Sequence, residues 1–308
     1  MTGIVNIGGQ SMALPELLTY RLLRTDGDSA DSFEVSFPTS RSLLPYLRKN
    51  REFLCKDGDE ICFRGVIDEI ETVYDTAFTT TLCGRGMAAK LMDNQVEGAE
   101  FYTLDLDTVL ERYVKPYGIT SISRQGSTGR LQLVSIGAGC SCYRILQGFC
   151  LHAGVPQPRF LADGTLLISA GGASYAIGED AILSARWRLC RYGVISQQTV
   201  LDLTAARARS AQAPDLAALG VQSRQVATRS GPFTQLTERT AQQRLAAARK
   251  SLDTLELVLP GHHPAQPGDT VTVSLPAMGI AGQYTVCEVC RQFDGEAETT
   301  QLRLRAKE

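Results

Sequence analysis

Two cysteines near the C-terminus have the spacing of a metal-binding pair. Cys287 and Cys290 form a C-x-x-C, and His262 and His263 precede them in the chain. Zinc sites use this spacing, usually with the cysteines on a turn. Here the pair lies within a predicted strand, where an offset of three directs side chains to opposite faces. No second C-x-x-C exists, so we interpret both residues as packed thiols and predict no metal and no cofactor.

Other residues that could do chemistry lack the necessary context. Cys140 and Cys142 precede a predicted helix whose N-terminus could stabilise a thiolate, but His152 lies at the far end of that helix. The run from Ile136 to Gly139 is like a nucleotide-binding turn without its third glycine. The chain contains no G-x-S-x-G, Walker, H-E-x-x-H or EF-hand motif. We therefore predict that the protein is not an enzyme.

The N-terminal part is predicted to be a β meander. Phe33, Val35 and Phe37 alternate with polar residues, which indicates a half-buried strand. After the turn at Asp57-Gly58, the segments EICFRGVIDEIETVYD and AFTTTLCGR follow with a short connection between them. Such connections are too short for parallel crossovers, so the strands are antiparallel. We place a first β domain at residues 1–98.

The middle of the chain is predicted to be a small α/β domain, at residues 99–176. The residues Leu106, Val109, Leu110 and Tyr113 follow the i, i+3, i+4, i+7 spacing of an amphipathic helix. A strand and a second helix follow, and the hairpin PRFLADGTLLIS closes the unit.

Strand character returns from Trp187, and we place a second β domain at residues 177–308. It contains a segment rich in Ala, Arg, Gln and Ser at 205–232 and a predicted helix at 236–252. The composition of this segment favours a mobile loop, the alternative being a loop that orders against a partner. The basic residues of this candidate partner-contact loop are Arg207, Arg209, Arg224 and Arg229.

The two β regions share an order of features. In each, a Gly-Asp turn, a strand with a glycine, a Glu-apolar pair and a closing Thr/Leu/Arg strand follow one another. The Glu-apolar pairs begin at Glu69 and Glu288. We expect two related barrel-like modules, in which Gly65 corresponds to Gly282 or a near neighbour.

Composition limits the classes of partner. The 308 residues include 31 Lys and Arg against 33 Asp and Glu, a net charge of −2, which argues against nucleic acid as the principal partner. Without an apolar run of roughly 18 residues we expect no membrane span, and the N-terminus lacks the features of a signal peptide. Nine scattered cysteines are interpreted as free thiols in a reducing cytoplasm.

Several motifs, in their order along most of the chain, resemble those of phage tail baseplate hub proteins. A strand F-x-G-x-x-x-E is followed by G-R-G-x-x-x-x-L-x-D-N and by a helix that ends in P-Y-G-I. The matching structural positions are Phe63, Gly65, Glu69, Gly84, Arg85, Gly86, Asp93, Asn94, Pro116 and Gly118. The stretch from Gly139 to Pro156 resembles the α/β domain of this family, and residues 241–289 resemble its C-terminal barrel.

This resemblance implies a mainly β fold with two tube-like antiparallel β-barrel domains and a small α/β domain. It implies a homotrimeric ring that joins the hexameric tail tube to the central spike of a contractile phage tail or a phage-tail-like injection particle. Three copies of two barrels would match a sixfold tube. The implied partners are the tube, the spike and other baseplate proteins, with the tape measure protein as a further candidate. DNA would pass through without specific binding, and the particle would assemble in the bacterial host cytoplasm.

Two alternatives belong to other functional classes. A cell-wall-degrading hub enzyme would need a catalytic constellation, and none is evident. A carbohydrate-binding β module would show exposed aromatic residues, yet the chain has one tryptophan, Trp187, and 7% aromatic residues. A hydrolase assay on purified cell wall and a glycan-binding screen would discriminate them.

Overall fold

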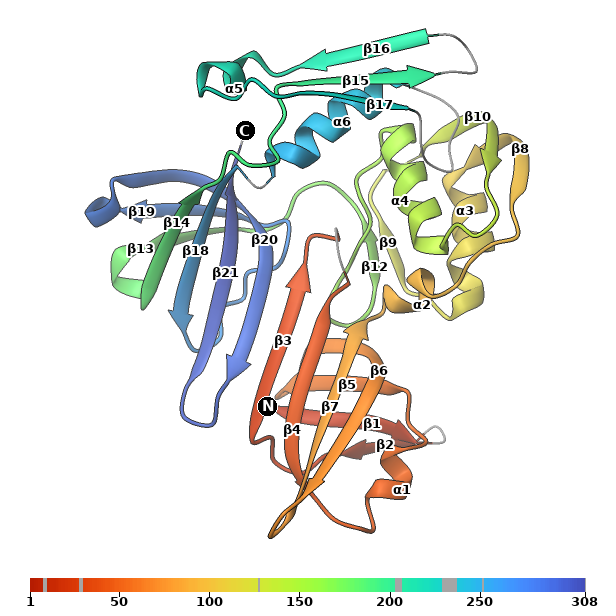
Figure 1. Cartoon of the computed structure of the whole chain (residues 1–308). Helices are drawn as coiled ribbons and strands as arrows, with labels where there is room; N and C mark the ends of the chain where they lie inside the picture. Colours follow the sequence, from red (N-terminus) through yellow and green to blue (C-terminus); the bar gives the residue numbers. More distant parts are fainter. Residues whose placement is uncertain are drawn as a thin grey trace.

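The computed structural model describes residues 1–7, 10–27, 30–126, 128–202, 207–228, 237–250 and 252–307. Within these residues most strands join one 13-stranded sheet, and the others form three small sheets. Figure 1 shows a β module near the N-terminus, a second β module near the C-terminus, and the helices α2, α3 and α4 gathered to one side of them. The expectation of a mainly β fold with a small α/β part is confirmed.

The first module is a curled antiparallel sheet with the strand order β3-β4-β7-β6-β5-β1-β2. Its elements are β1 (Thr2–Ile7), β2 (Gln10–Ala13), β3 (Thr19–Thr25), β4 (Ser32–Thr39), α1 (Leu44–Leu47), β5 (Glu52–Asp57), β6 (Glu60–Tyr74) and β7 (Phe78–Gly86). In β4 the alternating apolar residues are buried, as their spacing predicts. The ring of Phe33 stacks on that of Phe53 of β5 at 4.3 Å, so the two sides of the curled sheet share a core.

The α/β part packs two helices against the β8–β10 pair. Its elements are α2 (Ala89–Met92), β8 (Ala99–Asp105), α3 (Leu106–Tyr113), β9 (Ile122–Arg124), β10 (Arg130–Ile136), α4 (Cys142–Ala153), β11 (Arg159–Phe160) and β12 (Leu166–Ile168), with a 3₁₀ turn at Lys115–Tyr117. The Asp105 carboxylate accepts a hydrogen bond from the Thr108 amide at 2.9 Å and caps α3. Gly154, in the left-handed conformation, ends α4. The core of this part also includes Met87 and Leu91.

The second module has the strand order β14-β18-β21-β20-β19-β13. These strands are β13 (Ser174–Gly178), β14 (Ser184–Leu189), β18 (Asp253–Pro260), β19 (Thr270–Leu275), β20 (Ile280–Phe293) and β21 (Glu298–Ala306), with 3₁₀ turns at Glu179–Ala181 and Pro276–Met278. The order repeats the β3-β4-β7-β6-β5-β1 order of the first module. One pair departs from the expected antiparallel arrangement, because β13 runs parallel to β19.

The two modules are joined edge to edge. The second half of β20 pairs with β3, from Glu288 opposite Thr25 to Phe293 opposite Tyr20. Eight strands thereby form one continuous run, β14-β18-β21-β20-β3-β4-β7-β6, which Figure 1 shows extending across both modules.

The expectation of a loop at 205–232 is wrong for the part of that segment that the structure describes. The strands β15 (Gln197–Asp202), β16 (Arg207–Gln212) and β17 (Arg224–Thr228) form a small sheet, with α5 (Pro214–Ala218) between β16 and β17. The helix α6 (Thr237–Arg249), shorter than the predicted 236–252, packs on β15 and β16. Four apolar side chains (Val194, Leu216, Val221 and Leu252) supply a core that the polar composition obscures. No helix in the described ranges is long and apolar enough to cross a membrane.

Candidate assembly surface

Three glycines of the hub-like motif lie where the sheet of the first module is most closely packed. A Cβ on Gly65 would lie 2.3 Å from the Arg85 carbonyl oxygen, and one on Gly84 would lie 2.0 Å from the Val66 carbonyl oxygen. Gly86, which pairs with Gly65 across the ladder, faces the side chain of Asp31. Only glycine fits at such approaches.

Arg85 connects the sheet to the α/β part. Its Nε and Nη2 donate to the two carboxylate oxygens of Asp68 at 2.7 and 2.9 Å. Its Nη1 and Nη2 donate to those of Asp93 at 2.9 and 2.8 Å. These hydrogen bonds lower the pKa of Asp93 below its usual value. The neighbouring Asn94 accepts a backbone hydrogen bond from Cys142 at the start of α4, at 2.9 Å.

The structure therefore brings part of the predicted motif together. Arg85, Asp93 and the three glycines meet where β7 passes into α2, and Phe63 is buried in the adjoining core. Pro116 and Gly118 lie apart from them, in the turn that follows α3, where Gly118 is left-handed. Glu69 is exposed on β6. The described contacts of the glycines are packing contacts, and those of Arg85 and Asp93 are hydrogen-bonded ion pairs.

Ladder register relates the two modules residue by residue. Glu69 and Glu288 each follow a bulge in the long strand of their module. Counted back along the two strands from these glutamates, Gly65 corresponds to Tyr284, which is two residues from the expected Gly282. Across the strands, the pair Arg21–Glu34 on β3 and β4 corresponds to the pair Arg186–Glu256 on β14 and β18.

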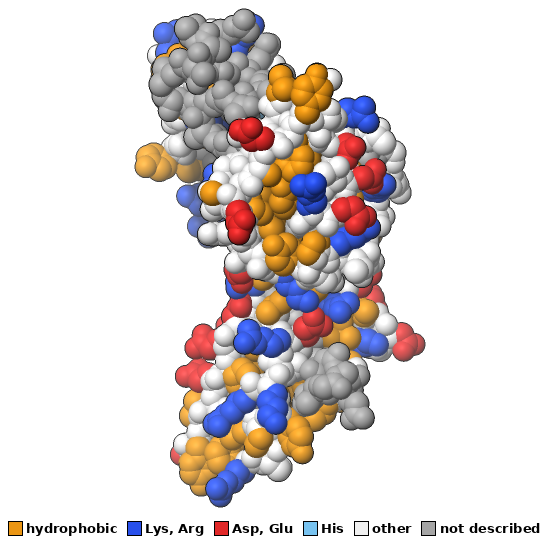
Figure 2. Space-filling view, turned by 90° about the vertical axis from the view of Figure 1, so that its right-hand side faces the viewer, with side chains coloured by type: hydrophobic (Ala, Val, Ile, Leu, Met, Phe, Trp, Pro, Cys, Tyr) orange, Lys and Arg blue, Asp and Glu red, His pale blue; other side chains and the backbone are white. Residues whose placement is uncertain are grey.

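The sheet face turned away from the two cores is polar. On the first module, Ser36 Oγ and Thr81 Oγ1 are 2.8 Å apart, and on the second, Arg303 Nη1 donates to Glu288 at 3.0 Å. Around the side of the molecule shown in Figure 2, acidic and basic side chains are likewise interspersed. A polar surface of mixed sign offers no strong attraction to phosphates.

A buried polar network holds the junction between the modules. Arg291, on β20, has a buried guanidinium that donates to the Cys62 sulfur at 3.0 Å, to Asp57 at 3.3 Å and to Glu298 at 3.4 Å. Tyr20 donates to Glu298 at 2.6 Å, and its burial together with this hydrogen bond raises the pKa of the phenol. Residues from both modules are thus paired across the junction.

We expected Cys287 and Cys290 to point to opposite faces of their strand, and this expectation is wrong. It was one ground for the prediction that the pair binds no metal. The bulge at Cys287 breaks the alternation of β20, so that Val286 and Val289, three residues apart, pack in the same core. Burial raises the pKa of the Cys287 thiol to about 11. In the part of the chain that the structure describes, no three His, Cys, Asp or Glu side chains group as metal ligands. All nine cysteines are free thiols.

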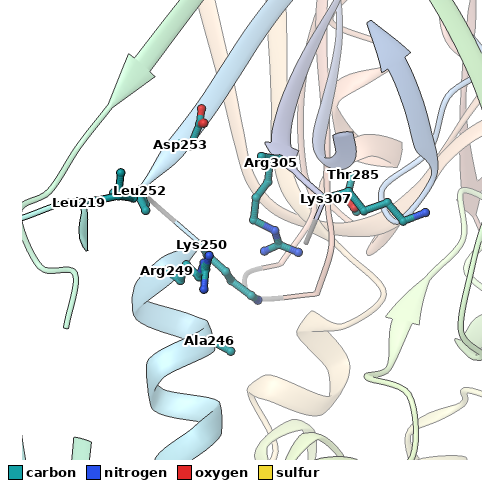
Figure 3. Close-up of a pocket in the computed structure, with 10 residues that line it drawn as sticks. Leu219, Ala246, Arg249, Lys250, Leu252, Asp253, Thr285, Arg305 and Lys307 are labelled. Atoms are coloured by element: carbon teal, nitrogen blue, oxygen red, sulfur yellow. The ribbon is translucent and has the colours of Figure 1, made fainter. Parts of the chain in front are cut away.

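A hollow between α6 and the second module is lined mainly by basic and apolar side chains. Figure 3 shows Arg249 and Lys250 at the end of α6 facing the side of the hollow that carries Arg305 and Lys307. Arg249 forms an ion pair with Asp215 of α5. The side chains that line it are mostly basic or apolar, with Asp253 and Thr285 as the other polar groups.

Two of the four arginines of the predicted partner-contact loop have described side chains. Arg209 on β16 and Arg224 on β17 are exposed, on the two strands that flank β15. Arg207 begins β16, and Arg229 lies outside the described residues.

Comparison with known proteins places the fold among tail proteins. The sequence matches no protein-family model and no curated protein. A tail protein from Neisseria meningitidis MC58 is similar in structure, with a TM-score of 0.79 and 17% identity over 99% of this chain and 96% of that one. The 43 kDa tail protein of prophage MuSo2 from Shewanella oneidensis has a TM-score of 0.77 and 15% identity, over 99% and 98%.

A more distant likeness extends beyond phages. An E. coli component of the type VI secretion system, described as structurally similar to T4 bacteriophage tail proteins gp27 and gp5, has a TM-score of 0.60 and 8% identity. The match covers 99% of this chain and 77% of that one. At these identities the likeness shows a shared fold.

Proposed function

We propose that this chain is a structural baseplate hub of a contractile phage tail or a phage-tail-like injection particle. Three copies form a ring that joins the hexameric tail tube to the central spike. The role is structural and not enzymatic. The chain acts in the particle baseplate, after assembly in the bacterial host cytoplasm.

One observation carries the proposal: the chain contains two β modules of the same strand order in one continuous sheet. Three copies supply six near-equivalent modules, which reconciles a threefold spike with a sixfold tube. The fold shared with tail proteins supports this reading.

The partners follow from this position in the particle. They are two further copies of the chain, the tube protein on one side, the spike and other baseplate proteins on the other, and the tape measure protein as a further candidate. DNA passes without specific contact, in keeping with the mixed charge of the polar face. We propose domains at 1–98, 99–176 and 177–308, with Arg207, Arg209, Arg224 and Arg229 in a partner-contact region.

Localisation in the particle tests the proposal. Gold-labelled antibodies against the chain should mark the end of the tail tube nearest the spike, in particles from the producing strain. Label along the tube or on the capsid would contradict the hub role.

A further inference from the structure

Two strand edges are left open by the repeat of modules. Within the chain, the second half of β20 pairs with β3. The counterpart of β20 is β6, and that of β3 is β14. In the described residues, Glu69–Tyr74 of β6 pairs only with β7, and β14 pairs only with β18. These edges lie at the two ends of the eight-strand run.

The open edges carry exposed apolar side chains. On β6, Val73 is 55% and Tyr74 is 68% exposed, and on β14, Trp187 is 46% and Leu189 is 37% exposed. Charge is one usual protection of an open edge, and exposed apolar side chains there favour pairing with another chain. Here the exposed charges are acidic on Glu69–Tyr74 of β6 and basic on β14, so they oppose self-pairing of either edge and favour pairing of one with the other. Figure 2 shows hydrophobic side chains at the lower tip of the molecule, where Figure 1 places the β6–β7 hairpin.

We propose that the β6 edge of one copy pairs antiparallel with the β14 edge of the next, in the register that β20 and β3 already use. This inference rests on the proposed trimer and names the interface that closes it. Each copy offers one edge of each kind, so the contact is head-to-tail, and in the proposed trimer it closes into a ring. Three copies would join their eight-strand runs into a single closed sheet.

The register follows from the junction within the chain. There, Gln292 of β20 lies opposite Arg21 of β3. The counterpart of Gln292 is Val73 of β6, and the counterpart of Arg21 is Arg186 of β14, so Val73 of one copy lies opposite Arg186 of the next. Antiparallel pairing then sets Glu71 opposite Arg188 and Tyr74 opposite Ala185.

Side chains in this register are complementary on both faces. Glu71 and Arg188 form an opposite-charge pair on the polar face, which stabilises a cross-strand contact. On the core face, Ile70 lies opposite Leu189, and Tyr74 is diagonal to Trp187. Within the chain, Phe293 is the counterpart of Tyr74, and its ring packs 5.9 Å from that of Tyr20 on β3. The interface therefore continues both the polar face and the apolar core from one copy to the next.

A native cysteine allows a direct test. The register sets Glu69 opposite Cys190, which follows β14 and is partly exposed. In the variant Glu69→Cys, mild oxidation of the concentrated full-length chain should form a disulfide between copies. Paired strands hold facing Cβ atoms about 5 Å apart, so this bond should form at least about tenfold faster than in Ile70→Cys, whose side chain faces the core.

Controls and products make the result decisive. The double variant Glu69→Cys, Cys190→Ser should lose the product, and peptide mass spectrometry should identify the 69–190 link. Covalent products should stop at three chains. A bond no faster than in Ile70→Cys, or a ladder beyond three chains, would overturn the proposed pairing.

The single tryptophan gives a second readout. Trp187 lies on the β14 edge, so association should shift its emission to shorter wavelength as concentration rises, and the shift should weaken in Glu71→Arg. An unchanged spectrum in demonstrated trimers would overturn the pairing. The hub role is tested separately by position and copy number in the particle, so a failure of either is distinguishable from the other.

Discussion

At the residue scale, the glycines of β6 and β7 fix how closely the strands approach. A methyl group on Gly84 would overlap the Val66 carbonyl oxygen and the Phe33 ring. We expect Gly84→Ala to lower the free energy of unfolding by about 3 kcal/mol or more, the cost of overpacking a dense core. Gly137→Ala is the matched control, since nothing lies within 4 Å of its added Cβ. Denaturant titration measures both, and equal midpoints would contradict the packing role.

Asp31 gives the stability a pH dependence. Burial raises its pKa from 3.8 to about 6, although Arg24 and hydrogen bonds from Thr25 oppose the rise. The folded chain therefore holds the Asp31 proton more tightly than the unfolded chain. This stabilisation is complete below about pH 4 and is lost as pH rises through 6, by up to about 3 kcal/mol. In Asp31→Asn, thermal unfolding should lose that component of the pH profile, and an unchanged profile would contradict it.

At the element scale, the junction of β20 with β3 depends on Arg291. Removal of its buried guanidinium leaves Glu298 without its cation, so Arg291→Met should cost about 3 kcal/mol or more. Arg303→Met, on the adjacent strand, removes a half-exposed ion pair with Glu288 and should cost under about 1 kcal/mol. Chemical denaturation of both variants tests this order. Equal losses would show that the junction does not rely on Arg291.

Much of the element content could be predicted from local pattern. The alternation in β4 and the helical spacing in α3 and α4 have short-range causes, and those elements are where we predicted them. The strands β1 and β2 were not predicted. The strands β16 and β17 were interpreted as loop, because short polar strands have a weak periodic signal.

What the sequence could not supply is the pairing between distant segments. The β20–β3 junction joins residues more than 260 positions apart, and no local pattern encodes it. The bulge at Cys287 likewise depends on its partner strand and inverted the facing that we assigned to the C-x-x-C. In the candidate site, the G-R-G motif was found from the resemblance. The hydrogen bonds of its Arg85 to Asp68 were found only in the structure.

At the scale of the whole molecule, the proposed ring takes two of its six modules from each chain. Burial of the β6 and β14 edges on ring closure removes exposed apolar surface. The isolated chain is then expected to be monomeric or prone to aggregation when dilute, and the spike would promote assembly by binding the closed ring. Sedimentation with and without the spike would measure this dependence, and equal association in both would contradict it.

Electron microscopy of the intact particle tests the hub role most directly. The reconstruction should show three copies of this chain on the tail axis, between the hexameric tube and the spike, with two modules of each copy in a six-module ring. Six copies of the chain, or a position away from the tail axis, would contradict the account.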